Sequence, residues 1–266
     1  MAAAGPFITL ASTTSTQNSG LLAAILPQFT KKTGIEVHVV AVGTGQALRI
    51  ARNGDADVLL VHHRPSEDAF VAAGHGIERR DVMFNDFVII GPRDDPAEIR
   101  DSASAIDAFR KIAATRRVFA SRADDSGTNL REMEIWDAAG IEPRGSWYLE
   151  TGAGMGATLN LSSVKNAYLL SDRGTWISFG NKGNLEILHA GDPALFNPYG
   201  IILVNPARHP YAKIDLARIF ENWLLSPAGQ RAIGAFRIGG VQAFCPDAEG
   251  LSDANLDRGS CPIARQ

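Results

Sequence analysis

Residues 121–129 combine the groups that an anion site needs. They read Ser-Arg-Ala-Asp-Asp-Ser-Gly-Thr-Asn and place one arginine, Arg122, beside the hydroxyls of Ser126 and Thr128. Ser126 is a preferred helix N-cap residue, so the backbone N–H groups after it have no helical carbonyl to bind. Those donors, the positive end of the helix dipole and the guanidinium all favour a bound anion. The alternative is a plain helix cap, with the arginine ion-paired to a neighbouring aspartate.

A strand-to-helix transition must hold this turn. Val118 and Phe119 belong to a short β-type run before it, whereas Leu130, Met133 and Trp136 begin a helical pattern after it. Apolar residues at this spacing line one face of a helix. We therefore expect a strand that ends at the turn and a helix that buries these three side chains.

Hydroxyl-bearing turns also follow the first two predicted strands, Phe7 to Ala11 and Ile35 to Val42. The first turn reads Ser-Thr-Thr-Ser-Thr and the second Gly-Thr-Gly-Gln, which places Thr13, Thr14 and Thr44 where strands become helices. Taken alone, each threonine could be an ordinary helix cap. Their recurrence at successive strand ends favours a shared role as anion donors.

A glycine-rich turn, residues 152–158, follows the predicted strand Trp147 to Thr151 and opens another helix. Its Gly156 could bring a backbone N–H close to a ligand, because glycine has no side chain to obstruct the approach. Close packing of two helices is an equal alternative for these glycines.

The elements between the turns alternate between strand and helix. Short apolar runs at residues 7–11, 35–42 and 57–62 are each followed by a helical pattern, and Pro27 should kink or shorten the first helix. Three successive β–α units predict a parallel sheet with helices on both faces. Such sheets bind ligands at the carboxyl ends of their strands, where the hydroxyl turns lie.

A Gly-Pro break at Gly91 and Pro92 indicates a crossing into a second domain, and the predicted strand Pro198 to Val204 crosses back. We therefore expect an α/β fold of two lobes, each a mostly parallel sheet flanked by helices, with a ligand cleft between the lobes. Residues 1–91 and 198–266 would form lobe I, and residues 92–197 would form the inserted lobe II.

The overall composition argues against some classes of binding partner. The 266 residues include 26 basic and 29 acidic side chains, a net charge of −3, and no basic run is longer than a pair. This balance argues against a nucleic-acid partner. No apolar stretch approaches the roughly 20 residues that a membrane-spanning helix needs.

The two cysteines, Cys245 and Cys261, lie in a tail rich in glycine and proline. Their spacing fits no zinc pattern. Two free thiols are one reading; we favour a disulfide, which would add about 3 kcal/mol and would indicate an oxidising compartment. The first residues lack the basic region and apolar core of a secretory signal, so the protein is either cytoplasmic or a processed, exported form.

Motifs of catalysis are weak. Ser162 and Lys165 match the Ser-x-x-Lys of penicillin-binding enzymes, but no Lys-Thr-Gly follows them. His62 and His63 end a strand and point to opposite faces, which disfavours a shared metal. No Gly-x-Ser-x-Gly, Walker-A or His-Glu-x-x-His pattern occurs. We expect no catalytic residue, no cofactor and no site for a metal cation.

The whole chain resembles the tungstate-binding proteins of tungstate ABC importers, which are periplasmic binding proteins with two lobes. The resemblance lies in residues 12–20, 41–48, 55–62, 85–92 and 121–128. It implies an oxyanion, tungstate or molybdate, held by the first-turn threonines, a second-turn hydroxyl, and the arginine and threonine of the third turn. With Ser126 and Gly156 from the turns described above, the expected ligand set is Thr13, Thr14, Thr44, Arg122, Ser126, Thr128 and Gly156.

The resemblance also implies a membrane permease as partner, a monomer, and a periplasmic or otherwise extracytoplasmic location. The chain has Ala123 where a glycine is expected, which would restrict the backbone of the arginine turn. Tungstate and molybdate carry no proton near neutral pH, so a site made only of donors suits them.

Three alternatives remain. The arginine turn is also similar to the Arg-x-Asp-x-Ser-Gly-Thr turn of phosphate-binding proteins, where Asp124 would accept the proton of monohydrogen phosphate. A cytoplasmic anion sensor would need a DNA-binding module, and no helix-turn-helix pattern precedes Phe7. An enzyme on this scaffold would need a general base, for which Asp124 and Asp125 are the candidates.

Overall fold

The structure is a computed structural model that describes residues 5–249. Two compact units divide the described chain: unit 1 comprises residues 5–84 and 198–249, and unit 2 comprises residues 85–197. Cys261 lies outside the described residues, so its pairing with Cys245 stays a prediction. Within the described part, no helix combines the length and apolar character that crossing a membrane requires.

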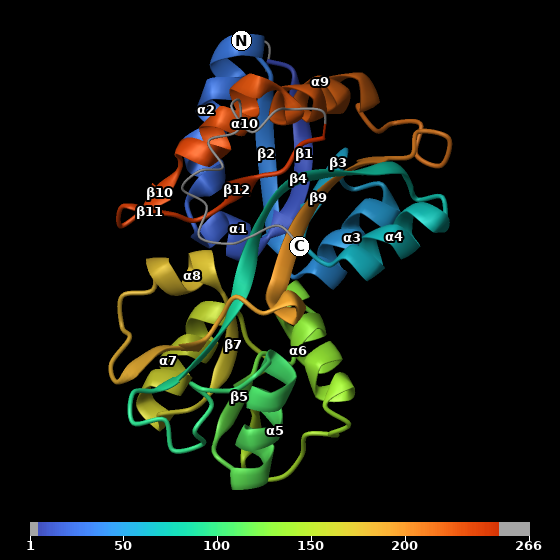
Figure 1. The fold of residues 1–266 in the computed structure, drawn as a ribbon. Helices are drawn as coiled ribbons and strands as arrows, with labels where there is room; N and C mark the ends of the chain where they lie inside the picture. The colour runs from blue at the N-terminus through green and yellow to red at the C-terminus, as the bar shows by residue number, and fades with distance from the viewer. Residues whose placement is uncertain (1–4, 250–266) are drawn as a thin grey trace. The chain divides into compact units, whose positions relative to one another are not determined.

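Unit 1 alternates strands and helices in its N-terminal half and ends in a helical pair and short strands (Figure 1). Its elements in chain order are β1 (Phe7–Thr13), α1 (Thr14–Asn18), α2 (Leu21–Thr33), β2 (Glu36–Val42), α3 (Thr44–Asn53), β3 (Val58–Val61), α4 (Arg64–Ala72), the first part of β4 (Gly76–Pro92), most of β9 (Phe196–Val204), α9 (Ile214–Leu225), α10 (Pro227–Ala235), β10 (Arg237–Ile238), β11 (Val241–Gln242) and β12 (Cys245–Pro246).

The sheet of unit 1 is mixed, with strand order β12-β4-β9-β3-β1-β2. The strand β1 runs parallel to both β2 and β3, as the three β–α units predict. The strand β9 is antiparallel to β3, and β12 is antiparallel to β4. Because Thr13 pairs with Val42, β1 and β2 end at the same edge of the sheet.

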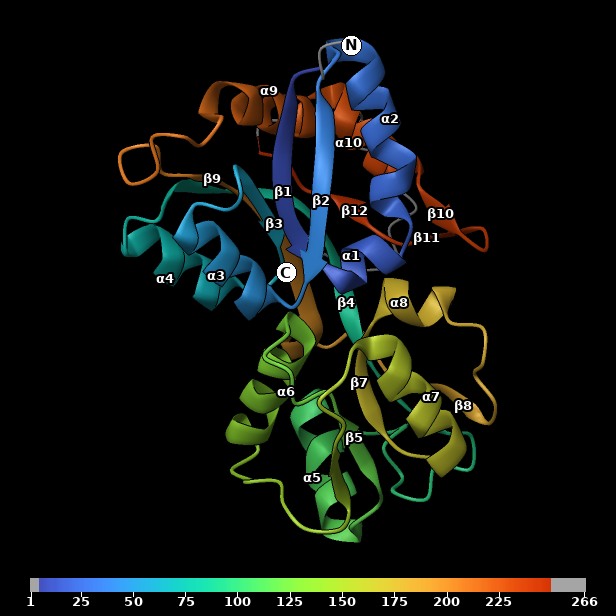
Figure 2. The ribbon, with the colours of Figure 1, turned by 180° about the vertical axis from the view of Figure 1, so that it is seen from behind.

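Helices cover both faces of this sheet (Figure 2). Alternation along β1 sends Ile8 and Leu10 into the cluster with α2, α9 and α10, whereas Ala11 packs with α3 and α4. Both layers are fully buried, so the position of the β1 carboxyl end is fixed by packing on two sides.

The helix α2 extends unbroken through Pro27, so the expectation of an early end is wrong. Leu21, Leu22, Ile25 and Phe29 are all buried on one face of α2. Burial of these side chains contributes about 1.5–3 kcal/mol each, so the four together exceed the cost of about 3 kcal/mol for one proline inside a helix.

Unit 2 is a second α/β layer structure. Its elements are the rest of β4, α5 (Ala105–Thr115), β5 (Phe119–Ser121), α6 (Gly127–Ala138), β6 (Tyr148–Glu150), α7 (Met155–Lys165), β7 (Leu169–Asp172), α8 (Arg173–Ser178), β8 (Leu185–His189) and the 3-10 turn η1 (Pro193–Leu195).

Alternating residues of β4 separate the two cores of unit 2. Phe87 and Ile89 pack with α5 and α6, whereas Val88 and Ile90 pack with α7 and α8. The strands β5 and β6 are parallel, and β7 and β8 are antiparallel to β4. Ser121 pairs with Glu150, so β5 and β6 also end at one edge.

The first division between the units lies inside β4, between Phe84 and Asn85, and not at the expected Gly91–Pro92 break. Gly91 continues the strand by pairing with Glu186 of β8. A Cβ there would lie 2.5 Å from Cδ1 of Tyr168, so the glycine serves packing and does not mark a break. The second division follows Asn197.

Gly200 of β9 supplies a test of the packing in unit 1. A Cβ there would lie 2.3 Å from Oε2 of buried Glu67 and 2.7 Å from Nε of Arg79, which donates to that oxygen. We expect Gly200→Ala to lower the free energy of unfolding by about 1–3 kcal/mol, measured by urea denaturation. Gly180→Ala is the control, because a Cβ at Gly180 meets nothing within 4 Å. Equal unfolding midpoints for the two variants would contradict this account.

Candidate functional site

The carboxyl edge of β1 and β2 in unit 1 carries an unpartnered hydroxyl. Thr44 is the first residue of α3, directly after the N-cap Gly43, and is fully buried. No described residue forms a hydrogen bond with its Oγ1. A buried hydroxyl without a partner costs about 1–3 kcal/mol, so this atom marks a position where a ligand would be bonded.

Thr13 lies at the same edge and caps α1. Its Oγ1 accepts from the backbone N–H of Thr16 at 3.3 Å and lies 2.8 Å from the Thr16 hydroxyl. If the Thr16 hydroxyl is the donor in that contact, Thr13 keeps its own proton to donate. Thr14 is the first residue of α1 and is half-buried. Ser12 faces elsewhere, because its hydroxyl donates to the carbonyl of Leu60 at 2.8 Å.

In unit 2 the carboxyl edge of β5 and β6 holds the arginine turn. Ser126 is the N-cap of α6 and accepts from the N–H of Asn129 at 3.2 Å, which confirms the predicted cap. Thr128 lies in the first turn of α6 and is 1% exposed. Its Oγ1 has no hydrogen-bond partner in the described chain.

Arg122 combines an ion pair with an unused donor. Its Nη2 donates to Oδ2 of Asp124 at 2.6 Å, which is the ion pair of the alternative reading. Its Nε is buried and lacks an acceptor among residues 5–249. Oδ1 of Asp124 accepts from the N–H of Ser126 at 3.2 Å, so both carboxylate oxygens are engaged within the turn. The aspartate thus holds the guanidinium while Nε remains available to an anion.

The glycine turn before α7 leaves room at its surface. Gly154 is the N-cap and Gly156 the second residue of α7, and a Cβ at either position would meet no atom within 4 Å. Close helix packing therefore does not explain these glycines. Thr158 is not a free donor, because its hydroxyl is bonded to that of Thr151 at 2.9 Å and lies near the carbonyl of Gly154.

Two residues of the arginine turn adopt left-handed backbone conformations. Ala123 has φ of 47° and Asp125 has φ of 55°. Such conformations cost non-glycine residues roughly 1–2 kcal/mol each. Ala123 adopts the conformation although glycine would suit it better, and hydrogen bonds from its neighbours must hold it there.

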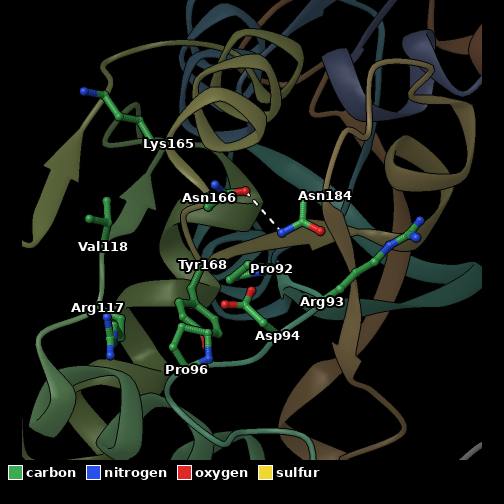
Figure 3. A pocket seen from close by; sticks show the side chains of 10 residues that line it. All are labelled: Pro92, Arg93, Asp94, Pro96, Arg117, Val118, Lys165, Asn166, Tyr168 and Asn184. Carbon is green, nitrogen blue, oxygen red and sulfur yellow. Dashed lines mark hydrogen bonds between the residues drawn. The ribbon is translucent and has the colours of Figure 1, made fainter.

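Unit 2 has a hollow of about 690 Å³ whose chemistry differs from that of the arginine turn (Figure 3). It lies at the opposite ends of β5 and α7, since it is lined by Arg117 and Val118, which precede β5, and by Lys165, which ends α7. The hydroxyl of Tyr168 there accepts from the N–H of Ala97 and donates to Asp95. None of its lining residues has a buried side-chain atom without a partner.

Comparisons with known proteins identify the family of the chain. Residues 2–228 match the model of the PBP superfamily domain. The tungstate-binding protein TupA of Peptoclostridium acidaminophilum is 46% identical over 245 residues, which cover 91% of this chain and 86% of that protein. The chain belongs to the TupA family of the PBP superfamily. The family resemblance and the α/β fold class expected from the sequence are thus confirmed.

Solved structures of the TupA family match over most of their length. The tungstate-binding protein TupA from Desulfovibrio alaskensis G20 is 48% identical, with 92% of this chain and 100% of that chain covered and a TM-score of 0.78. The structure titled as the tungstate ABC transporter from Geobacter sulfurreducens is 47% identical, with 86% and 98% covered and a TM-score of 0.79.

One residue behind the arginine turn of this TupA-family chain was missed by sequence reasoning. Glu132 of α6 is 2% exposed, whereas Met133, expected on the buried face, is 43% exposed. Burial raises the pKa of the Glu132 carboxyl to about 7, although hydrogen bonds from Tyr148, Ser121 and Trp136 oppose that shift. The spacing of Glu132 four residues before Trp136 is the signal that could have placed it on the inner face.

The raised pKa predicts a pH dependence of stability. Between the ordinary pKa near 4.5 and the folded pKa of about 7, the folded state holds a proton that the unfolded state has lost. The extra proton stabilises the folded state at low pH, and this stabilisation is lost as pH rises through 7. The free energy of unfolding should fall by about 3 kcal/mol over the whole range. We expect the stability of Glu132→Gln relative to wild type to increase from pH 5 to pH 8, measured by urea denaturation. The exposed Glu142→Gln should track wild type, and parallel curves for Glu132→Gln would refute the assignment.

Proposed function

We propose that this protein captures tungstate, or the similar anion molybdate, as the solute-binding protein of an ABC importer. One observation carries the proposal: Thr44 Oγ1, Arg122 Nε and Thr128 Oγ1 are buried donors without partners among the described residues. Each follows the carboxyl end of a strand, where a helix begins. The names of the TupA relatives support tungstate as the ligand.

The donor set matches the chemistry of such an anion. A fully deprotonated oxyanion only accepts hydrogen bonds, and every group assigned to it here can donate. The hydroxyls of Thr13, Thr14 and Ser126 and the backbone N–H of Gly156 complete the proposed set. Bonds from a buried guanidinium are charge-assisted and about twice as strong as neutral ones, which gives Arg122 the largest share.

The proposed activity is binding without covalent chemistry. The proposed set contains no general base: of the two candidate carboxylates in the turn, Asp124 is engaged by Arg122 and Ser126, and Asp125 is exposed. The protein would release its anion to a membrane permease and would act outside the cytoplasm as a monomer without a cofactor.

The phosphate alternative needs Asp124 as an acceptor for the ligand's proton. Its Oδ2 accepts from Arg122 and its Oδ1 from Ser126, and each oxygen keeps a second lone pair that could accept that proton. The names of the TupA relatives, and not the bonds of Asp124, favour tungstate over phosphate.

Removal of single donors tests the proposed function. We expect tight one-to-one tungstate binding by isothermal titration, and a dissociation constant at least about 30-fold higher for Arg122→Ala, because a charged donor contributes about 2 kcal/mol. Thr44→Val and Thr128→Val keep the side-chain shape and should each cost about 5–30-fold. Exposed Thr115→Val is the matched control. Unchanged binding in all three site variants would eliminate the assignment.

Asp124→Asn separates the two anions. Wild type should bind phosphate at least about 100-fold more weakly than tungstate, and the variant should lose about tenfold in tungstate affinity because Arg122 loses its charged partner. If phosphate instead bound more tightly than tungstate, and Asp124→Asn abolished that binding, the phosphate alternative would replace the proposal.

A further inference from the structure

A buried carboxylate, that of Glu132, is bonded to Ser121, the residue directly before Arg122. Oε2 of Glu132 accepts from the hydroxyl of Ser121 at 2.8 Å. Its Oε1 accepts from the indole N–H of Trp136 at 3.1 Å and from the hydroxyl of Tyr148 at 2.7 Å. All three partners donate, so Glu132 in its ionised form, which predominates above pH 7, uses both oxygens only as acceptors.

The contact with Glu132 decides how the Ser121 hydroxyl is used. Since Ser121 gives its proton to Glu132, its oxygen is left to accept. It accepts from the backbone N–H of Ala123 at 3.2 Å and from the side-chain amide of Asn129 at 3.3 Å. Both lone pairs of this buried oxygen are therefore occupied.

Asn129 carries the network to the far side of the turn. Its Oδ1 accepts from the backbone N–H of Asp125 at 3.2 Å. The backbone N–H groups of the two left-handed residues, Ala123 and Asp125, are thus bonded to the side chains of Ser121 and Asn129. Ser121 is bonded to Glu132 directly, and Asn129 is connected to Glu132 through Ser121. Arg122 directly precedes Ala123, so the direction of its backbone depends on the same bonds.

We propose that Glu132 is a positioning residue of the anion site, acting through Ser121 and Asn129 to hold the arginine turn in its binding conformation. The inference rests on the proposed function, because it assigns the turn to an anion. Glu132 does not touch the ligand in this account. It holds the strained backbone of the turn in place before the anion binds, so the free energy of ordering the turn does not reduce the affinity.

A positioning role and a mainly electrostatic role of Glu132 predict opposite changes in the tungstate dissociation constant when the charge of Glu132 is removed. The direction of that change therefore tests the proposal. A buried negative charge near a dianion repels it, so a mainly electrostatic role predicts tighter binding after neutralisation. Positioning predicts weaker binding, because the amide of Glu132→Gln places an N–H donor against at least one of three donors. If that donor faces Ser121, the serine hydroxyl loses its acceptor and its bond to Ala123 is displaced.

The test is tungstate titration of the whole protein at pH 8 with four variants. Glu132→Gln and Ser121→Ala should each raise the dissociation constant at least about tenfold. The double variant should cost little more than the larger single change, because both remove the same link and such residues are not additive. Glu221→Gln is the matched control: Glu221 is another buried helical glutamate, paired with Arg218 and Arg80 in unit 1.

A spectroscopic readout separates positioning from general loss of structure. The Trp136 indole N–H, assigned with Trp136→Phe, should shift in the amide spectrum of wild type when tungstate saturates the protein. In Ser121→Ala that shift should be largely lost while the remaining indole signals and the circular dichroism are unchanged. Ser121→Ala also keeps the test decisive if Glu132→Gln does not fold.

Three results would overturn the inference. If Glu132→Gln binds tungstate as tightly as wild type or more tightly, Glu132 does not position the turn and only repels the anion or stabilises the fold. Additive losses in the double variant show that Glu132 does not act through Ser121. A wild-type protein that binds no tungstate rejects the proposed function itself, and is distinguished from the first two results because they require a wild type that binds.

Discussion

Buried donors must find an acceptor, and that constraint accounts for how both strand edges are built. Thr44, Arg122 and Thr128 each keep one donor atom away from water without a partner among the residues described. Leaving such groups unpaired destabilises the folded chain by about 1–3 kcal/mol each. In the proposed function, an anion bonded to such a donor recovers that free energy on binding, so an atom that weakens the empty protein would strengthen its complex.

Bonds within the arginine turn hold the Arg122 guanidinium without using its Nε. Asp124 engages one end of the Arg122 guanidinium and the N–H of Ser126, which leaves Nε unpaired. By contrast, the hydroxyl of Thr158 is bonded to nearby groups, the hydroxyl of Thr151 and the carbonyl of Gly154. The difference between a ligand donor and a structural hydroxyl is therefore set by neighbours and not by residue type.

Two-sided packing supplies the rigidity that the turns need. In unit 1, β1 has Ile8 and Leu10 in one core and Ala11 in the other. In unit 2, β4 divides its residues between two cores in the same way, and Phe119 of β5 packs against Phe109 and Trp136. Strands held on both faces cannot shift, so the positions of Thr44 and Arg122 within their own units are well defined.

The sequence by itself determined the local parts: the alternation of strands and helices, the Ser126 cap, and the hydroxyl turns at strand ends. These follow from residues close in the chain, through apolar periodicity and capping chemistry. It missed β8 and the burial of Glu132, and it placed the first crossing at Gly91–Pro92. Gly91 faces Tyr168, which is distant in the chain. The i, i+4 spacing of Glu132 and Trp136 is readable from the sequence, but the donors Ser121 and Tyr148, which also hold Glu132, lie on other elements. Only the tertiary structure decided which polar groups have hydrogen-bond partners. A hydrogen bond depends on the distance between two atoms in space, and the positions of their residues along the chain do not determine that distance.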